Sequence, residues 1–365
     1  MKQVLSRAGR ALWLGGPLLV LLAVPLSSCS EGSSLVSSES PLPPADSTPP
    51  PDSTPPDTTT PPPPDTTTPP PPDTTPPPPP DTTGPANPTD CGPSAGASGP
   101  PQHVGIPFGP ATMPPSKFST QWSGTIYTAT SATCLPVHLA RARSVNQRMF
   151  VSFTGNEQHN RDENGFSMTK WKQRVDRFRS VNLTSYIEDG TILGHFILDE
   201  PADPANWSGK VVTKEQIEEM ARYSKEIWPT MPTMIRAWPD YLHGFQFKHL
   251  DAVRFHYLEL RGPIDPWLQK NMGEARALGL AIIGGLNVLN GGSKNSGIPG
   301  RHEKRYGMSA NEIRTWGNRF LNEPGMCAFI LWEDDDAYFA RSDIKAALEE
   351  LAAKARSYPK QPCRR

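Results

Sequence analysis

The sequence predicts an α/β fold for residues 101–365, specifically a (β/α)8 barrel of the TIM type. Short apolar segments alternate there with segments of helical periodicity, the pattern of a parallel sheet with a helix after each strand. About 265 residues remain beyond the polar N-terminal region, close to the usual size of such a barrel. The eight expected strands are residues 104–109, 125–129, 149–154, 192–199, 233–238, 252–258, 280–287 and 328–333.

The helices between these strands have recognisable starts and apolar faces. Thr213 with Gln216, and Ser309 with Glu312, fit the capping box at a helix N-terminus. The first βα units are degenerate because residues 125–129 are short and no convincing helix precedes them, so a seven-stranded or open barrel is the alternative. Aromatic and aliphatic residues at helical spacing predict two buried faces. These residues are Trp171, Val175 and Phe178 on one helix, and Ile313, Trp316 and Phe320 on another.

Residues 1–28 resemble a bacterial lipoprotein signal peptide. Three cations precede an apolar segment at residues 11–26, and small residues lead from that segment to Cys29. The apolar segment is shorter than the roughly 20 residues of a spanning helix; an ordinary signal peptide or a membrane helix is the alternative. The resemblance implies an exported protein held on the membrane through lipidated Cys29. Ser30 after the cysteine implies the outer membrane or cell surface.

Residues 29–100 are expected to form a disordered tether rich in Pro, Thr and Asp. They carry almost no large apolar side chains, and the tripeptide Asp-Thr-Thr recurs between proline runs. Proline fixes φ and removes a backbone donor, so this composition favours polyproline II and cannot build a core. At ~3.1 Å per residue the tether would hold a domain on the order of 150–200 Å from the membrane. A stalk modified on threonine is the alternative.

Charge and cysteine content limit the partners and the compartment. Beyond residue 100 the chain has 33 Lys and Arg and 28 Asp and Glu, without a basic stripe, so we expect no nucleic-acid partner. We expect a monomer. Four cysteines follow Cys29 and suggest disulfides, with three pairings allowed. They are Cys91, Cys134, Cys327 and Cys363. We favour Cys91 with Cys363, because the ends of a barrel chain meet.

Polar and aromatic residues gather at the ends of the expected strands, where barrel enzymes have their active sites. Period-two alternation places Arg254 and His256 inside the barrel, because their apolar neighbours should face the helices. Carboxylates, cations and aromatic rings around one rim suit a polyhydroxylated ligand, so we expect a carbohydrate substrate. The expected substrate-binding residues are Arg236, Trp238, Arg254, His256, Tyr257, Asn287 and Trp332.

The strand ends resemble those of the (β/α)8 glycoside hydrolases. In the largest clan of that group, strand four ends in Asn-Glu-Pro and strand eight in a sugar-stacking Trp; here Asp199-Glu200-Pro201 and Trp332 hold the matching places. The resemblance implies that Glu200 is the general acid/base. The clan's nucleophile at the end of strand seven is missing, since Asn287 stands there.

Glycoside cleavage needs a second carboxyl group besides the acid. Glu333, Asp334 and Glu259 are the sequence candidates, while Asp199 would instead raise the pKa of Glu200 through like charge. The catalytic set is therefore expected to be Glu200, Glu333 and Asp199, without a cofactor.

Each of these residues has a structural alternative. Glu200 could cap the next helix or pair with Arg236, and Arg254 with His256 could form a buried ion network with Glu200 or Glu259. The acidic segment from Glu333 to Asp336 could be a solvated turn or a calcium site. The rival to a glycan-hydrolysing enzyme is therefore a surface lipoprotein that binds glycan or is structural. A metal-dependent hydrolase has less support, because the histidines form no obvious ligand set.

Overall fold

The computed structural model describes residues 91–92 and 101–365. The expected signal peptide, the lipidation at Cys29 and the tether lie outside the described residues. Within the described part of the chain, no helix is both long enough and apolar enough to cross a membrane.

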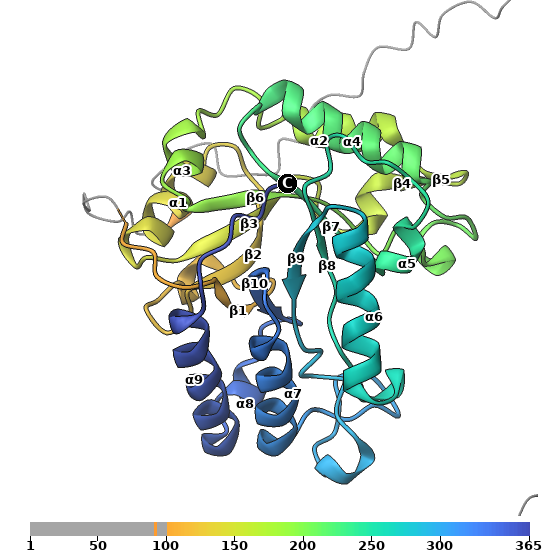
Figure 1. The fold of residues 1–365 in the computed structure, drawn as a ribbon. Coiled ribbons are helices and arrows are strands. Elements are labelled where there is room, and N and C mark those ends of the chain that lie inside the picture. The colour runs from red at the N-terminus through yellow and green to blue at the C-terminus, as the bar shows by residue number, and fades with distance from the viewer. Residues whose placement is uncertain (1–90, 93–100) are drawn as a thin grey trace, which may run out of the picture. The chain divides into compact units, whose positions relative to one another are not determined.

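Eight parallel strands form one sheet that curls into a nearly closed barrel (Figure 1), as the sequence predicted. The neighbours run in the order β1-β10-β9-β8-β7-β6-β3-β2, so each strand pairs with the next strand of the barrel in chain order. The strands are β1 (Phe108–Pro110), β2 (Gly124–Thr128), β3 (Arg148–Ser152), β6 (Ile192–Asp199), β7 (Thr233–Arg236), β8 (Ala252–Arg254), β9 (Ala281–Gly284) and β10 (Met326–Leu331).

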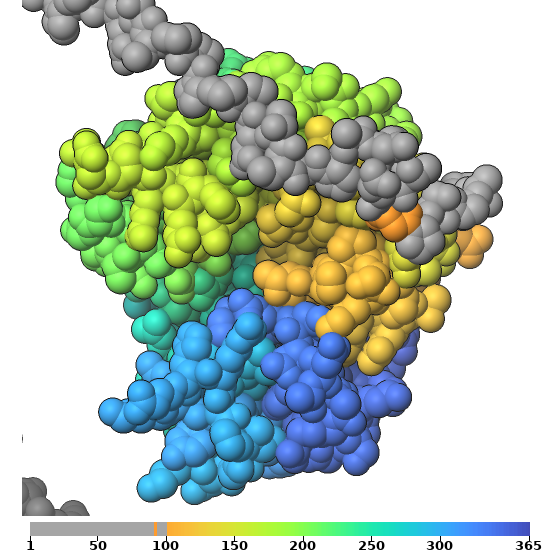
Figure 2. Space-filling view, turned by 180° about the vertical axis from the view of Figure 1, so that it is seen from behind, coloured from red at the N-terminus to blue at the C-terminus, as the bar shows by residue number. Residues whose placement is uncertain are grey.

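The barrel closes between β1 and β2 through a parallel bridge from Ala111 to Ile126. Glycine permits this close approach, because a Cβ on Gly109 would lie 2.2 Å from the carbonyl oxygen of Gly124. The first βα unit is degenerate, as expected, since only the 3-10 turn Pro115–Lys117 lies between β1 and β2. Figure 2 shows the early segments in orange and yellow adjoining the C-terminal helices in blue.

Helices surround the sheet, and their starts follow the sequence signals. Both expected capping boxes are present, at Thr213 with Gln216 and at Ser309 with Glu312. A two-stranded hairpin of β4 (Arg161–Asp162) and β5 (Gly165–Phe166) lies outside the barrel. The helices are α1 (Leu135–Ser144), α2 (Met168–Asp176), α3 (Thr184–Glu188), α4 (Lys214–Ile227), α5 (Pro239–Leu242), α6 (Ile264–Ala277), α7 (Ala310–Asn322), α8 (Asp336–Phe339) and α9 (Ser342–Ser357).

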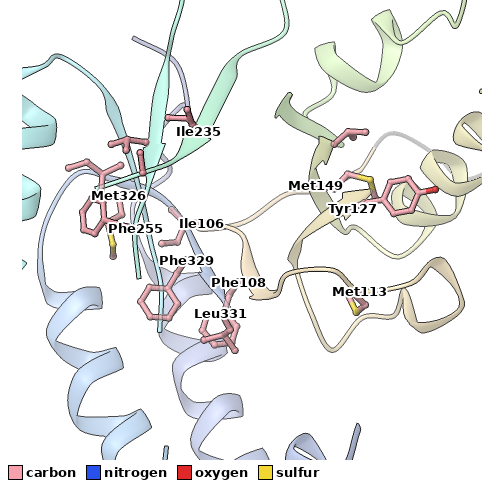
Figure 3. Close-up of a cluster of buried hydrophobic side chains, with 14 of the residues drawn as sticks. Ile106, Phe108, Met113, Tyr127, Met149, Ile235, Phe255, Met326, Phe329 and Leu331 are labelled. Atoms are coloured by element: carbon pink, nitrogen blue, oxygen red, sulfur yellow. The ribbon is translucent and has the colours of Figure 1, made fainter. Parts of the chain in front are cut away.

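Apolar side chains are buried in two sets that alternate along the strands. On β10, Ala328 and Ile330 belong to a small set inside the barrel, whereas Phe329 and Leu331 belong to the large set between sheet and helices. The rings of Phe329 and Phe108 stack with centroids 5.6 Å apart in the large set, where Figure 3 shows them together. The helix faces predicted from Trp171 and Ile313 are buried in the same set.

Two disulfides join Cys91 to Cys134 and Cys327 to Cys363, so the favoured pairing of Cys91 with Cys363 is wrong. Cys91 lies beside α1, where its carbonyl contacts His138 Nε2 at 3.1 Å. Cys363 instead joins the set of side chains inside the barrel. Arg365 after it donates a hydrogen bond to the carbonyl of Phe247, which precedes β8. The C-terminal residues therefore lie across the N-terminal ends of the strands.

Candidate active site

A cavity of about 380 Å³ opens at the C-terminal ends of β6 to β9. Its volume lies within the range of about 300–1,000 Å³ for small-ligand sites, and it stands where barrel enzymes carry out their chemistry. The lining residues that matter below are Glu200, Asp203, Arg236, Trp238, Arg254, His256, Arg261 and Asn287. Six of these were expected from the sequence, so the structure brings most of the predicted site together.

Glu200 follows β6 directly and has a strained backbone. Its φ of +42° lies in the left-handed region, which is uncommon for a residue other than glycine. Hydrogen bonds hold the peptide in place: Glu200 N donates to Arg236 O at 3.1 Å, and Trp207 Nε1 donates to Glu200 O at 2.9 Å. The side chain keeps 41% of its surface exposed. The carboxylate is thus fixed at the base and reachable at its tip.

Arg236 at the end of β7 binds both carboxylates of the Asp199-Glu200 pair. Its Nη1 lies 2.9 Å from Asp199 Oδ1 and 2.5 Å from Glu200 Oε1. The other oxygen of Glu200 accepts a hydrogen bond from Asn206 Nδ2 at 3.3 Å. The ion pair expected as the structural alternative for Glu200 is therefore present.

His256 and Arg254 point into the barrel, as the alternation along β8 predicted. Arg236 Nη2 donates to His256 Nε2 at 3.2 Å, which assigns the proton of the neutral ring to Nδ1. Burial, followed by the charges of Arg236, Arg254 and Arg261, holds the pKa of His256 well below its usual range. The ring is therefore a neutral acceptor at the centre of the site.

Glu157 is a functional candidate that the sequence reasoning missed. It begins the 3-10 turn Glu157–Asn160 in the loop after β3. Burial raises the pKa of its carboxyl, and the negative charges of Asp199 and Glu200 raise it further, with Arg236 acting in the opposite direction. The charged groups of the site therefore act on Glu157, and its carboxyl keeps a proton more readily than that of a solvated glutamate. A carboxyl five residues beyond a strand carried no signal in the sequence.

Aromatic and amide groups line the outer part of the cavity. Trp238 follows β7 and forms an edge contact with His256, with ring centroids 6.3 Å apart. The guanidinium of Arg261 lies over the Trp238 ring, 4.4 Å from its centroid. Asn287 follows β9, and its side-chain oxygen accepts a hydrogen bond from Asn290 N at 3.0 Å. Its amide nitrogen is the group left to meet a ligand.

Four expected residues do not line this cavity: Asp199 is paired with the lining residue Arg236, and the other three lie elsewhere. Tyr257 is buried against Trp267 and Trp316 on the helix side of the sheet, and its hydroxyl donates to Gly262 O at 2.6 Å. Trp332 contacts His302 instead, with ring centroids 5.7 Å apart. Glu333 is ion-paired with Arg301. The structure thus separates these three residues from Glu200.

The other acidic candidates are also engaged elsewhere or exposed. Asp334 binds Lys117 Nζ at 2.5 Å, Asp335 caps α8, and Glu259 is exposed. No three His, Cys, Asp or Glu side chains within residues 91–92 and 101–365 converge as a metal site would require.

No protein-family model and no curated protein matches the chain. The barrel is similar in chain path to a GH2 β-galacturonidase of Eisenbergiella tayi bound to galacturonate, with 12% identity and a TM-score of 0.48 over 70% of this chain and 52% of that one. It is also similar to a β-D-glucuronidase of Dictyoglomus thermophilum, with 9% identity and a TM-score of 0.47 over 71% of this chain and 52% of that one. For xylanase 10C of Cellvibrio japonicus the identity is 10% and the TM-score 0.42, over 71% of this chain and 69% of that one.

These solved structures are glycoside hydrolases, the group that the strand ends resembled, and the likeness concerns the path of the barrel. The chain spans about half the length of the galacturonidase and the glucuronidase. The case for an activity therefore has to be made from the cavity itself.

Proposed function

We propose that this protein is a carbohydrate-active enzyme that hydrolyses glycosidic bonds of an extracellular or cell-envelope glycan, with Glu200 as general acid/base. One observation carries the proposal: Glu200, which directly follows β6, lines a cavity that is also lined by Trp238. Carboxylates can handle the proton and water of glycoside cleavage, and an aromatic ring offers a surface for a sugar.

Two carboxyl groups take part in the proposed reaction. Glu200 lies against Arg236 with its tip exposed, so its carboxyl group can exchange protons with the substrate and with water. Glu200 gives a proton to the leaving oxygen as the bond from that oxygen to the anomeric carbon breaks, water supplies the new hydroxyl, and the proton that water gives up restores Glu200. Glu157, whose pKa is raised by burial, is the second carboxyl group that we propose for the reaction.

Reducing-sugar release from a panel of bacterial and plant glycans tests this proposal. The wild type should release sugar, and Glu200→Gln should reduce the rate by about 100-fold or more, in line with typical acid–base contributions. Glu350→Gln, on the distant surface of α9 where it pairs with Arg314, is the matched control and should keep the rate. Equal rates for the wild type and Glu200→Gln would remove Glu200 from the mechanism.

A glycan-binding or structural role without turnover is the second candidate. It is favoured by the ion pairs that neutralise Asp199 and Glu200, and by the separation of Glu333 from the cavity. Saturable binding of a glycan that the wild type leaves uncleaved would support this candidate over hydrolysis.

We further propose that Cys29 anchors the protein to the outer membrane or cell surface, and that the protein is a monomer. The lipoprotein-like signal ahead of Cys29 supports the anchor. Radiolabelled palmitate should be incorporated into the wild type and not into Cys29→Ala, which should also leave the membrane pellet. Retention of the Cys29→Ala protein in that pellet would contradict the anchor. The mass in solution, from light scattering on chain lacking residues 1–29, checks the monomer.

A further inference from the structure

The floor of the Glu200 cavity carries a buried guanidinium without an acidic partner. Arg254 is only 2% exposed and lines the cavity. Its Nε has no hydrogen-bond partner, and its Nη2 reaches only the carbonyls of Ile330 and Leu331, at 3.5 and 3.4 Å. No carboxylate of residues 91–92 or 101–365 forms an ion pair with it. Arg236, one strand away, has two such partners.

This arrangement is electrostatically unfavourable for Arg254. Burial and then the charge of Arg236 lower the pKa of Arg254, to about 9, while Asp199 and Glu200 act in the opposite direction. The side chain is still charged at neutral pH. A buried charge is costly unless an opposite charge and hydrogen bonds accompany it. An anion that enters the cavity would supply both.

A second cation stands at the entrance of the same cavity. Arg261 is exposed, lies over the Trp238 ring and has no ion-pair partner within the described part of the chain. The nearby Asp203 lines the cavity too, but its Oδ1 accepts a hydrogen bond from Ala205 N at 3.0 Å, where it caps a 3-10 turn. The cavity therefore has two guanidinium groups without an acidic partner among the described residues, and one of them, that of Arg261, lies over the Trp238 ring.

We propose that the ligand of this cavity is an acidic glycan, whose anionic substituent binds Arg254 while its sugar ring lies against Trp238 and Arg261. The proposal names the substrate class and so rests on the proposed function. A guanidinium binds a carboxylate or sulfate through two parallel hydrogen bonds, which a neutral hydroxymethyl group cannot reproduce. Uronic acids and sulfated sugars are the two sources of such a group.

Calorimetric titration with monosaccharides tests the proposal. The probes are glucuronate, galacturonate, glucose 6-sulfate, glucose and galactose, with the protein lacking residues 1–29 at 20 mM and 150 mM NaCl. We expect an acidic sugar to bind at least about 10-fold more tightly than its neutral counterpart, as for a hydrogen bond to a charged group. Preference for the uronates or for the sulfate identifies the anion. Equal Kd values for acidic and neutral sugars would overturn the proposal.

Two variants assign the preference to these side chains. Arg254→Met should reduce acidic-sugar binding to the level of the neutral sugar, and Arg261→Gln should weaken it by about 3- to 10-fold. Arg261 is exposed, so its variant remains informative even if Arg254→Met fails to fold. Arg314→Gln on α7 is the matched control and should bind like the wild type. An acid preference that survives both cavity variants would refute the assignment.

The titration also separates this inference from the proposed function, because a monosaccharide has no glycosidic bond to cleave. Tight uronate binding by a protein that cleaves no glycan would keep the inference and reject hydrolysis. Cleavage of neutral glycans alone, with no preference for acidic sugars, would keep hydrolysis and reject the inference.

Discussion

Removing the guanidinium of Arg236 should destabilise the barrel by a predictable amount. The Arg236 side chain is 11% exposed, whereas its partners Asp199 and Glu200 are 34% and 41% exposed. Loss of one partner of a fully buried ion pair costs about 3–5 kcal/mol, and exposed pairs contribute about 0–1 kcal/mol. Because only one partner here is buried, Arg236→Met should lower the free energy of unfolding by about 2 kcal/mol, intermediate between these limits.

Urea and thermal denaturation at pH 7 measure this loss. A change of about 2 kcal/mol corresponds to a fall in Tm of roughly 4–8 °C for a domain of this size. Arg314→Gln, which breaks the exposed pair with Glu350, should cost less than about 1 kcal/mol and serves as the control. A double-mutant cycle of Arg236→Met with Glu200→Gln should show coupling of about 1 kcal/mol. The reasoning is refuted if Arg236→Met is no less stable than the control, or if the cycle shows no coupling.

Three further predictions concern other groups. Glu157→Gln should stop hydrolysis and raise the free energy of unfolding at pH 7 by up to about 1 kcal/mol, because a carboxyl with a raised pKa destabilises the folded state as the pH rises through that pKa. A stability difference from the wild type that does not change between pH 4 and 7 would contradict this. Burial lowers the pKa of His195 to about 3, so the stability of the wild type should fall as the pH falls from about 6.5 toward 3. His195→Asn should make the urea midpoint less dependent on pH in this range, and an unchanged slope would show that His195 does not cause the fall. Cys327→Ser with Cys363→Ser should cost about 2–4 kcal/mol in urea; a midpoint like the wild type's would show that the disulfide does not stabilise the barrel.

The strands were predictable because each is a short apolar segment between polar ones. The segment at residues 192–199 became β6 with the same bounds. The strand predicted at residues 252–258 was too long, because the regular pairing of β8 stops at Arg254 and only an isolated bridge at Tyr257 follows. Local patterning therefore locates a strand better than it locates the strand's end, which depends on the neighbouring strands.

The site was predictable only where a side chain follows a strand directly. Glu200 and Arg236 could be placed because strand ends converge in a barrel, whereas Glu157 lies inside a loop and is linked to the site by the effect of the site's charges on the pKa of Glu157. Tyr257 shows a second limit, since it belongs to the outward-facing half of the alternation and packs under Trp267. The sequence also could not predict that Arg254 has no acidic partner among the described residues, because this depends on the distances between side chains on different strands.

The disulfide between Cys327 and Cys363, at the N-terminal ends of the strands, has a consequence for the order of folding. Cys363 follows every strand in the chain, yet it lies among the side chains inside the barrel and is bonded to Cys327 on β10. Because Cys363 follows all eight strands, this disulfide can form only after the whole barrel has been synthesised. Oxidation of this cysteine pair is therefore an event that follows synthesis, when the slow long-range pairing of the strands is also taking place.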